Sequence, residues 1–251
     1  MNVVGQVDSA LLEAVRGERL DSVEGAFAYS GGEDLTKPGL GDRRRTRLTL
    51  GGPDGRTYEL YLKRYSGGLA VREFANISAA RAAGIPTMQG VIWGRRARRS
   101  YLIVTAVPGD AIERCGQDFL TRHAGDGAAA ELTARLAELV RRFHAAGFVH
   151  RDLYSSHVFL DESQGRTRLY LIDLARMFSP RWRRFRWRVK DLAQLKFSMP
   201  PRWVEDCWDD FLTAYLGREG AARAGRYDRA IGGKVAAMHR RQQKKKEAAA
   251  R

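Results

Sequence analysis

The first half of the chain carries short apolar runs at the spacing of β-strands, separated by residues that end strands. Four such runs predict strands at residues 47–50, 57–63, 91–93 and 101–104. Gly51–Gly55 lies between the first two runs and predicts the turn of a β-hairpin that ends in Lys63. An Ala-rich segment at 71–83, stopped by Gly84 and Pro86, predicts a helix after this hairpin.

The second half of the chain has helical spacing instead. Apolar side chains recur every three or four residues between 128 and 146 and predict a long helix: Leu132, Leu136, Leu139, Val140 and Phe143. Further helices are predicted at 189–197 and 203–216, with a second hairpin from the runs at 158–160 and 170–172. The segment Val107–Gly109 contains a proline and a glycine, and it predicts a hinge.

The order of these elements predicts an α+β fold with two lobes. Residues 1–106 are expected to form a lead-in, with a short helix near 10–19, and a small antiparallel sheet with one helix. Residues 107–239 are expected to form a larger, mainly helical lobe. The Lys-, Arg-, Gln- and Ala-rich tail at 240–251 is expected to be disordered.

Composition narrows the class of protein. A chain of 251 residues with 44% hydrophobic residues can bury a sizeable core. Its two cysteines, Cys115 and Cys207, are far apart, which excludes a disulfide framework or zinc site readable from spacing. We expect neither a secretory signal nor a membrane span. The net charge of +15 predicts attraction to polyanions such as nucleic acid, anionic lipid or phosphorylated glycolipid.

The sequence 150–157, His-Arg-Asp-Leu-Tyr-Ser-Ser-His, carries the strongest chemical signal. It matches the kinase catalytic loop H-R-D-L-x-x-x-N except at the last position, where His157 replaces Asn. In such a loop Asp152 would orient the attacking hydroxyl. His157 would bind metal, touch phosphate or brace the loop. An HRD triplet also arises by chance on a basic surface, so its context decides.

That context supports a protein-kinase-like fold. Strand 170–172 ends in Asp173, where a kinase places its metal-binding carboxylate, although Asp173-Leu174-Ala175 replaces D-F-G. The alternative for Asp173 is a helix cap. Lys63 at a strand end and Glu73 in the next helix suit the pair that positions ATP phosphates. The alternative for both is a solvated surface.

The phosphate-covering loop has the weakest signal. No G-x-G-x-x-G is present, and the candidate is 38–43, with Gly39, Gly41 and Arg43. Two glycines would let backbone amides approach a phosphate. The alternative is an ordinary basic turn.

With these residues in place, the chain resembles the lipopolysaccharide core kinases, which act on heptose or Kdo. Residues 150–157 match that family's H-R-D-x-Y-x-x-H, and 171–176 match its I-D-L-x-R. Supporting matches occur at 84–91, 181–183 and 190–192. The resemblance implies the protein-kinase-like fold, ATP with Mg²⁺, and transfer of a phosphoryl group to a lipid-linked core sugar. It also implies cytoplasmic work, peripheral to the inner membrane.

A basic and aromatic stretch at 181–188 follows Asp173, where a kinase holds its acceptor. Its arginines suit anionic groups and its tryptophans suit a sugar or a membrane interface. A solvated face with core tryptophans and, less favoured, nucleic acid are the alternatives. The candidate acceptor-binding residues are Arg151, Tyr154, Arg176, Arg181, Trp182 and Arg183. Asp191 is expected to brace the catalytic loop and His144 to pack.

The mechanism predicted from the sequence requires Lys63, Asp152 and Asp173 to act on one nucleotide. Two rival functions stay open at this stage. One is a kinase of the same fold acting on protein or on a small molecule such as an aminoglycoside. The other is a non-catalytic pseudokinase that binds polyanions through its positive charge.

Overall fold

The computed structural model describes residues 7–36, 44–163 and 165–249. The chain divides into two compact units, and each is described by itself. The first unit comprises Met1–Val107 and Asp173–Ala175, and the second comprises Pro108–Ile172 and Arg176–Arg251. The division after Val107 lies close to the hinge expected from the sequence. The sequence did not predict that Asp173–Ala175 would group with the first unit.

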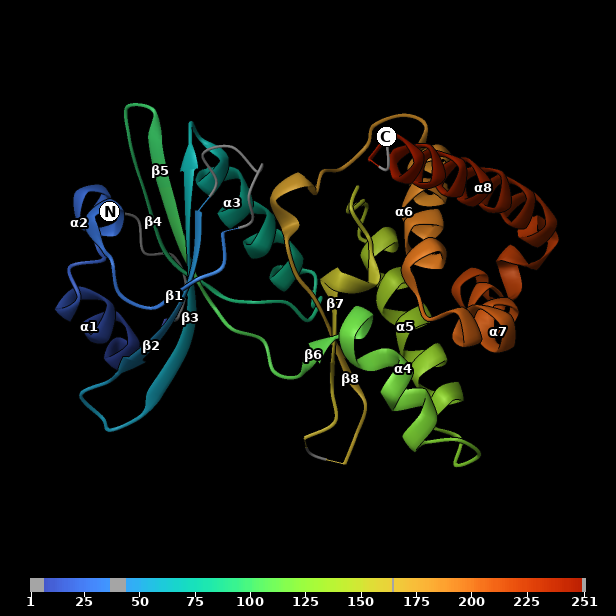
Figure 1. Cartoon of the computed structure of the whole chain (residues 1–251), viewed down its shortest axis with the longest axis horizontal. Helices are drawn as coiled ribbons and strands as arrows, with labels where there is room; N and C mark the ends of the chain where they lie inside the picture. The colour runs from blue at the N-terminus through green and yellow to red at the C-terminus, as the bar shows by residue number, and fades with distance from the viewer. Residues whose placement is uncertain (1–6, 37–43, 164, 250–251) are drawn as a thin grey trace. The chain divides into compact units, whose positions relative to one another are not determined.

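A twisted antiparallel sheet forms the centre of the first unit, with strand order β1-β2-β3-β5-β4 (Figure 1). Its strands are β1 (Glu33–Asp34), β2 (Arg44–Gly51), β3 (Thr57–Ser66), β4 (Gly90–Arg96) and β5 (Arg99–Thr105). The predicted hairpin is β2–β3. Strand β2 begins three residues earlier than expected because Arg44 pairs with Arg64, and β3 ends three residues later because Ser66 pairs with Arg99 of β5. Alternating side chains therefore face opposite sides of this sheet.

Helices cover both faces of the sheet. Helices α1 (Ser9–Gly17) and α2 (Val23–Ala28) lie on one face, and α3 (Leu69–Ala82) lies on the other (Figure 1). The sequence did not predict α2. This helix has six residues, too few to show a helical period, and it is held at its start by Ser22, whose Oγ accepts from Gly25 N at 3.0 Å.

The second unit is mainly helical. Its helices are α4 (Ile112–Arg122), α5 (Ala128–Ala145), α6 (Arg184–Ser198), α7 (Pro201–Gly220) and α8 (Ala224–Ala249). Its strands are β6 (Asp110–Ala111), β7 (Val158–Asp161) and β8 (Arg168–Leu171), which form a small antiparallel sheet in that order. Short 3₁₀ turns are η1 (Ser155–His157), η2 (Leu174–Arg176) and η3 (Ala221–Arg223). The sequence did not predict α4, in which glycine and charged residues interrupt the apolar pattern.

Aromatic side chains fill the core between α5 and α7. Trp203, Trp208 and Phe211 are almost completely buried and contact one another ring to ring. Trp203 Nε1 donates a hydrogen bond to Thr133 Oγ1 at 3.0 Å, so its polar edge is satisfied inside the core. This core fixes α5, from whose end the chain enters the segment 147–157.

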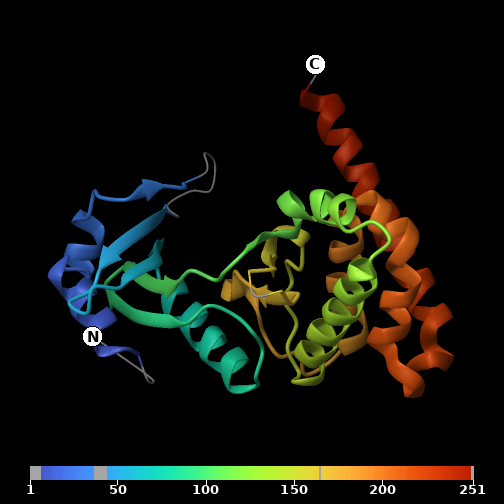
Figure 2. The same cartoon turned by 90° about the horizontal axis from the view of Figure 1, so that it is seen from below.

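The expectation of a disordered tail at 240–251 is wrong as far as Ala249, because α8 continues to that residue. The segment is rich in Ala, Lys, Gln, Arg and Glu, which have high helix propensity. Figure 2 shows the last turns of α8 extending beyond the helices with which it packs. Residues 240–249 are therefore both strongly basic and helical.

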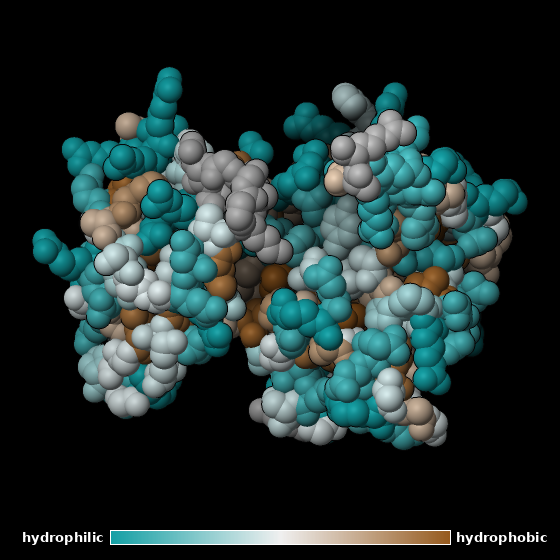
Figure 3. Space-filling view, viewed as in Figure 1, coloured by the Kyte–Doolittle hydropathy of each residue, from teal (hydrophilic) through white to brown (hydrophobic). Residues whose placement is uncertain are grey.

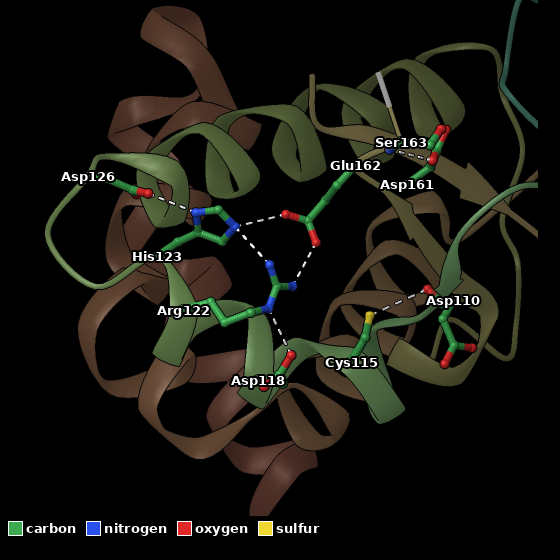
Figure 4. Close-up of polar contacts among 9 residues, drawn as sticks. All are labelled: Asp110, Cys115, Asp118, Arg122, His123, Asp126, Asp161, Glu162 and Ser163. Atoms are coloured by element: carbon green, nitrogen blue, oxygen red, sulfur yellow. Dashed lines mark hydrogen bonds and ion pairs between the residues drawn. The ribbon is translucent and has the colours of Figure 1, made fainter. Parts of the chain in front are cut away.

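Polar side chains fasten the end of α4 to the β7–β8 hairpin (Figure 4). Arg122 Nη2 donates to Glu162 Oε2 at 2.8 Å, and His123 lies between Glu162 Oε1 at 2.9 Å and Asp126 Oδ2 at 2.7 Å. The hydrogen bond to Asp126 raises the pKa of His123, desolvation opposes this, and Glu162 adds to the rise. Protonation of this histidine therefore strengthens the link between the two elements.

Hydrophilic side chains cover much of the visible surface of the second unit (Figure 3). None of the helices that the structure describes combines the length and apolar character that crossing a bilayer requires.

Candidate active site

A buried charge pair joins β3 to α3 in the first unit. The Lys63 ammonium donates a hydrogen bond to Oε1 of Glu73, and the Tyr65 hydroxyl donates to Oε2 of the same carboxylate. Glu73 has no exposed surface, and Lys63 is 7% exposed. Each carboxylate oxygen thus has its own donor, which a buried charge requires. The pairing of Lys63 with Glu73 predicted from the sequence is present, and its role in holding phosphates stays a prediction.

Tyr65 belongs to this cluster by strand geometry. It lies two residues after Lys63 on β3, so both side chains point to the same face of the sheet. Burial raises the pKa of Tyr65 well above its ordinary value, and the negative charge of Glu73 raises it further. The phenol therefore stays protonated and remains a donor to Glu73 at neutral pH.

Asp173 is paired with an arginine of the sheet. Arg45 Nη2 lies 2.9 Å from Asp173 Oδ2, and Arg45 is the cross-strand partner of Lys63 in the β2–β3 register. Cross-strand partners share a face, so Arg45 and Lys63 lie side by side. Burial lowers the pKa of Arg45, but the charge and hydrogen bond of Asp173 together with Tyr65 and Glu73 outweigh it, and the net shift is upward. Two cations and two carboxylates thus form one cluster in the first unit.

A backbone anchor holds the segment after Asp173. Asn76 Nδ2, from α3, donates to the Leu174 carbonyl at 2.7 Å. Asp173 itself has a φ of 58°, in the left-handed region that residues other than glycine seldom occupy. Such backbone strain is typical of functional positions.

In the second unit, Asp191 braces the loop predicted to be catalytic, as expected. Its buried carboxylate accepts from the backbone nitrogen of His150 at 2.6 Å and from that of Arg151 at 2.8 Å. His144 Nε2 lies 3.3 Å from the same carboxylate, while His144 Nδ1 contacts the Tyr215 hydroxyl at 2.9 Å. His144 is buried as predicted, and it also supports Asp191 through these polar contacts.

Hydrogen bonds close the loop between Asp152 and His157. His157 Nδ1 donates to the Asp152 carbonyl at 2.7 Å, and the Ile172 nitrogen donates to the His157 carbonyl at 3.0 Å. His150 Nε2 donates to the Ile172 carbonyl at 2.9 Å, and its ring stacks on His157 with centroids 5.8 Å apart. The next residue in the chain is Asp173. Both histidines of the motif therefore help to fix the strand end that carries this carboxylate.

Arg176 holds the carboxylate of Asp152. Its Nη1 lies 3.0 Å from Oδ1 and 2.9 Å from Oδ2. The sequence identified Arg176 as an acceptor-binding residue, whereas the structure shows it against the predicted catalytic carboxylate. Because Asp152 is partly exposed and held at both oxygens, its orientation is fixed while solvent can still reach it.

Arg151 has a different environment. Its guanidinium lies over the rings of Phe178 and Trp187, 5.6 and 5.7 Å from their centroids. Its carbonyl accepts from Lys190 Nζ at 2.8 Å, and its φ is 73°. Burial lowers the pKa of Lys190, and the charge of Asp152 opposes that shift. Arg151 thus packs within the second unit against two aromatic rings.

The basic stretch divides into an exposed part and a packed part. Trp182 is 81% exposed, and Arg181 and Arg183 are exposed beside it. Trp187, by contrast, packs edge-on against Phe178 with centroids 5.1 Å apart. The alternative of two core tryptophans therefore fails for Trp182. Binding of an acceptor by Arg181–Arg183 stays a prediction.

The predicted phosphate-covering residues Gly39, Gly41 and Arg43 lie outside the residues that the structure describes. Strands β1 and β2 flank this segment and pair antiparallel, with Asp34 opposite Thr46.

Tyr154, another candidate acceptor residue, is partly buried and meets the His157 ring edge-on at 6.5 Å.

A magnesium site built by protein alone is not present in the described ranges, where no three His, Cys, Asp or Glu side chains gather to hold a metal. Magnesium bound with a nucleotide needs only one or two carboxylates, since phosphates and water supply the other ligands. Asp173 fits that requirement. His157 fits less well because Mg²⁺ prefers oxygen.

Sequence reasoning missed the partners of the charged residues. It predicted no partner for Arg45, and it did not single out Tyr65. Tyr65 could have been found from the sequence, because side chains two residues apart on a strand share a face and Tyr65 follows Lys63 at that spacing. The pairing of Arg45 with Asp173 joins residues 128 positions apart, and no local pattern predicts it.

Comparison with known proteins is consistent with this geometry. The model of the lipopolysaccharide kinase (Kdo/WaaP) family matches residues 56–215. The lipopolysaccharide core heptose(I) kinase WaaP of Escherichia coli is 33% identical over 139 residues, which cover 51% of this chain and 52% of that protein. WaaP of Pseudomonas aeruginosa is 35% identical with the same coverage. The chain spans about half the length of these two curated relatives.

Solved structures agree on the fold. WaaP in complex with acyl carrier protein superposes with a TM-score of 0.70 at 27% identity, covering 97% of this chain and 99% of that one. An aminoglycoside-3'-phosphotransferase of type VIII gives a TM-score of 0.53 at 18% identity, covering 90% and 99%. The second likeness shows the kinase-like fold alone. With the family model matching 56–215, the chain belongs to the Kdo/WaaP lipopolysaccharide kinase family.

Proposed function

We propose that this protein is an ATP- and Mg²⁺-dependent kinase that phosphorylates a hydroxyl of a lipopolysaccharide inner-core sugar, heptose or Kdo. One observation carries the proposal. The Lys63 ammonium is buried and paired with the Glu73 carboxylate. In the same chain, which matches the family model, Arg176 holds the Asp152 carboxylate. A buried lysine held by a glutamate is the arrangement with which kinases position nucleotide phosphates.

The cluster in the first unit suits the donor side of the reaction. Lys63, held by Glu73, would position the ATP phosphates, and Arg45 lies on the same sheet face. Asp173 would hold Mg²⁺, with His157 as a second candidate, and the ion would neutralise charge on the phosphates. Arg45 now occupies the carboxylate of Asp173 and would exchange that partner for phosphate oxygens. The predicted loop residues Gly39, Gly41 and Arg43 would add backbone and charge contacts.

Asp152 suits the acceptor side. Its carboxylate would orient the attacking sugar hydroxyl and accept its proton. Arg176 would keep the carboxylate in one orientation, which is a positioning role. Because the Asp191 carboxylate holds the backbone nitrogens of His150 and Arg151, Asp152, the next residue, lies on a rigid turn.

The acceptor is proposed from charge, exposure and family. Lipopolysaccharide core sugars carry anionic groups, and Arg181 and Arg183 present exposed guanidiniums on either side of the exposed Trp182. Arg151, Tyr154 and Arg176 would contribute less directly, since each already has a partner within the protein. The net charge of +15 would favour peripheral work at the cytoplasmic face of an anionic inner membrane.

The catalytic assignment is tested with Asp152→Asn. We expect phosphoryl transfer to fall by about 10²–10⁴-fold, while the dissociation constant for ATP stays unchanged. The matched control is Asp209→Asn, at an exposed aspartate of α7, which should keep full turnover. Normal turnover of the Asp152→Asn protein would refute the assignment.

The acceptor is tested separately. The protein is incubated with labelled ATP and dephosphorylated lipopolysaccharide core, and in parallel with peptide and aminoglycoside acceptors. Label on a heptose or Kdo hydroxyl supports the proposal. Label only on peptide or aminoglycoside would place the protein with another substrate class of the same fold.

A further inference from the structure

A second group of arginines surrounds a cavity in the first unit. The cavity has a volume of about 400 Å³, and its lining residues come from α2, β2, β3 and β5: Phe27, Arg44, Arg64, Tyr65, Ser66 and Arg99. Three of these six side chains are guanidiniums and none is a carboxylate. We call this group the arginine pocket.

The arginine pocket uses the sheet face opposite to Lys63. Arg44 pairs with Arg64 across β2 and β3, and Ser66 pairs with Arg99 across β3 and β5. Arg64 and Ser66 alternate with Lys63 along β3, so their side chains leave the strand on the other side. The three arginines therefore leave the sheet on the face opposite to Lys63, whereas Tyr65, which donates to Glu73, also lines the cavity.

Arg64 is the buried element of the pocket. It is 6% exposed, and its guanidinium donates to the Ala26 carbonyl at 2.6 Å, the Thr46 hydroxyl at 3.1 Å and the Tyr29 carbonyl at 2.7 Å. All three acceptors are neutral. Within the described part of the chain, Arg64 has no carboxylate within ion-pair distance. Such a charge lacks the paired counterion that buried charges normally have.

The surroundings make this cation less stable. Burial lowers the pKa of Arg64, the positive charge of Arg44 lowers it further, and the negative charge of Asp34 opposes both effects. Arg99 lies with its guanidinium 5.2 Å from the centroid of the Phe27 ring, at the same cavity. Arg44 and Arg99 are exposed and, among the residues described, neither forms an ion pair. Three like charges thus line one small volume, and none of the six lining residues is an acid.

We propose that the arginine pocket binds a phosphate-bearing ligand, such as a phosphate monoester or diphosphate. Guanidiniums donate paired hydrogen bonds that fit the oxygens of a phosphoryl group. A multiply charged anion compensates three cations better than a single carboxylate does. The volume lies at the lower end of small-molecule sites, which favours a compact headgroup. Two sources share this chemistry, a soluble phosphate ester and a phospholipid headgroup.

The test compares the full-length wild type with Arg44→Gln/Arg99→Gln. Both substituted residues are exposed and lie outside the proposed catalytic cluster, so Arg64 and the core stay intact. The charge-matched control is Arg16→Gln/Arg229→Gln, at exposed arginines of α1 and α8. Pyrophosphate affinity is measured by calorimetry at physiological ionic strength. Sedimentation with phosphatidylcholine vesicles, with and without phosphatidic acid, forms the second arm. Thermal unfolding checks that each variant is folded.

We expect the pocket variant to bind pyrophosphate at least tenfold more weakly than the wild type, and the control to change less than twofold. Loss restricted to pyrophosphate identifies a soluble ester, and a matching loss of phosphatidic acid binding identifies a headgroup. Equal affinities of the wild type and the pocket variant would overturn the proposal. Equal losses in the pocket and control variants would also overturn it, since they would show attraction by net charge alone.

Discussion

Removing one partner of the buried Lys63–Glu73 pair should destabilise the protein strongly. Glu73→Gln leaves the Lys63 ammonium buried beside a neutral amide, whose NH₂ group cannot accept a hydrogen bond from either Lys63 or Tyr65. Lys63→Met leaves the buried Glu73 carboxylate with the Tyr65 hydroxyl as its side-chain hydrogen-bond donor.

The magnitude follows from burial. The side chains of Lys63 and Glu73 are 8% and 0% exposed, so neither charge can turn to water without unfolding its surroundings. Breaking such a pair by removing one partner costs about 3–5 kcal/mol. Replacing both partners removes the uncompensated charge. We therefore expect Lys63→Met/Glu73→Gln to lose no more stability than either single variant, a coupling of about 3 kcal/mol.

The assay is urea unfolding of the four proteins of this cycle, followed by circular dichroism and tryptophan fluorescence. The exposed pair Glu131–Arg135, 3.3 Å apart on α5, serves as the control cycle with Glu131→Gln and Arg135→Gln. A surface pair of this kind couples by only about 0.3–0.5 kcal/mol. If the losses at Lys63 and Glu73 simply add, with coupling no larger than in the control, the pair does not behave as a buried charge pair and the reasoning is wrong.

Three further predictions concern the second unit. Arg176→Gln should lower kcat for phosphoryl transfer by about 10²-fold with little change in the KM for ATP, because it frees the Asp152 carboxylate, and pre-steady-state kinetics would separate the two. Because folding raises the pKa of His123, its contribution to stability should be full below its unfolded pKa and lost as pH rises through its folded pKa. The difference in unfolding free energy between wild type and His123→Gln should therefore shrink with rising pH. A difference that stays constant with pH would contradict this. Gly109→Ala should cost more than about 2 kcal/mol in urea unfolding, because φ is 80° and a Cβ would lie 2.0 Å from the Leu160 carbonyl oxygen, whereas Gly125→Ala, at φ 88° in open space, should cost only the backbone strain.

Local sequence signals predicted the elements that place the chemistry. Breakers at Gly51–Gly55 located the β2–β3 turn, and the apolar run after it placed Lys63 on β3, although the strand continues three residues beyond Lys63. The spacing of ten residues to Glu73 allowed the pairing to be inferred, because the intervening glycines turn the chain into α3. These features are local in sequence, and they depend on propensities that a short window contains.

Non-local contacts were not accessible in this way. Arg176 lies 24 residues after Asp152, and its contact with that carboxylate depends on how β7, β8 and η2 fold back. Arg64 reads as one polar position in a strand, yet it is buried because α2 covers it and supplies carbonyl acceptors. Such placements are decided by tertiary packing, which overrides the local preference of a charged residue for solvent.

Both carboxylates assigned to chemistry are already compensated by arginine in the structure. Asp173 lies against Arg45, and Asp152 lies against Arg176. The two pairs differ in what their arginines neighbour. Arg45 lies beside Lys63 on one sheet face, so a divalent ion at Asp173 would release a second cation next to the lysine proposed to hold phosphates. Arg176 lies in a 3₁₀ turn, and its contact to both oxygens of Asp152 restricts rotation of that carboxylate. The first arrangement favours exchange of partners on binding, and the second favours a fixed base.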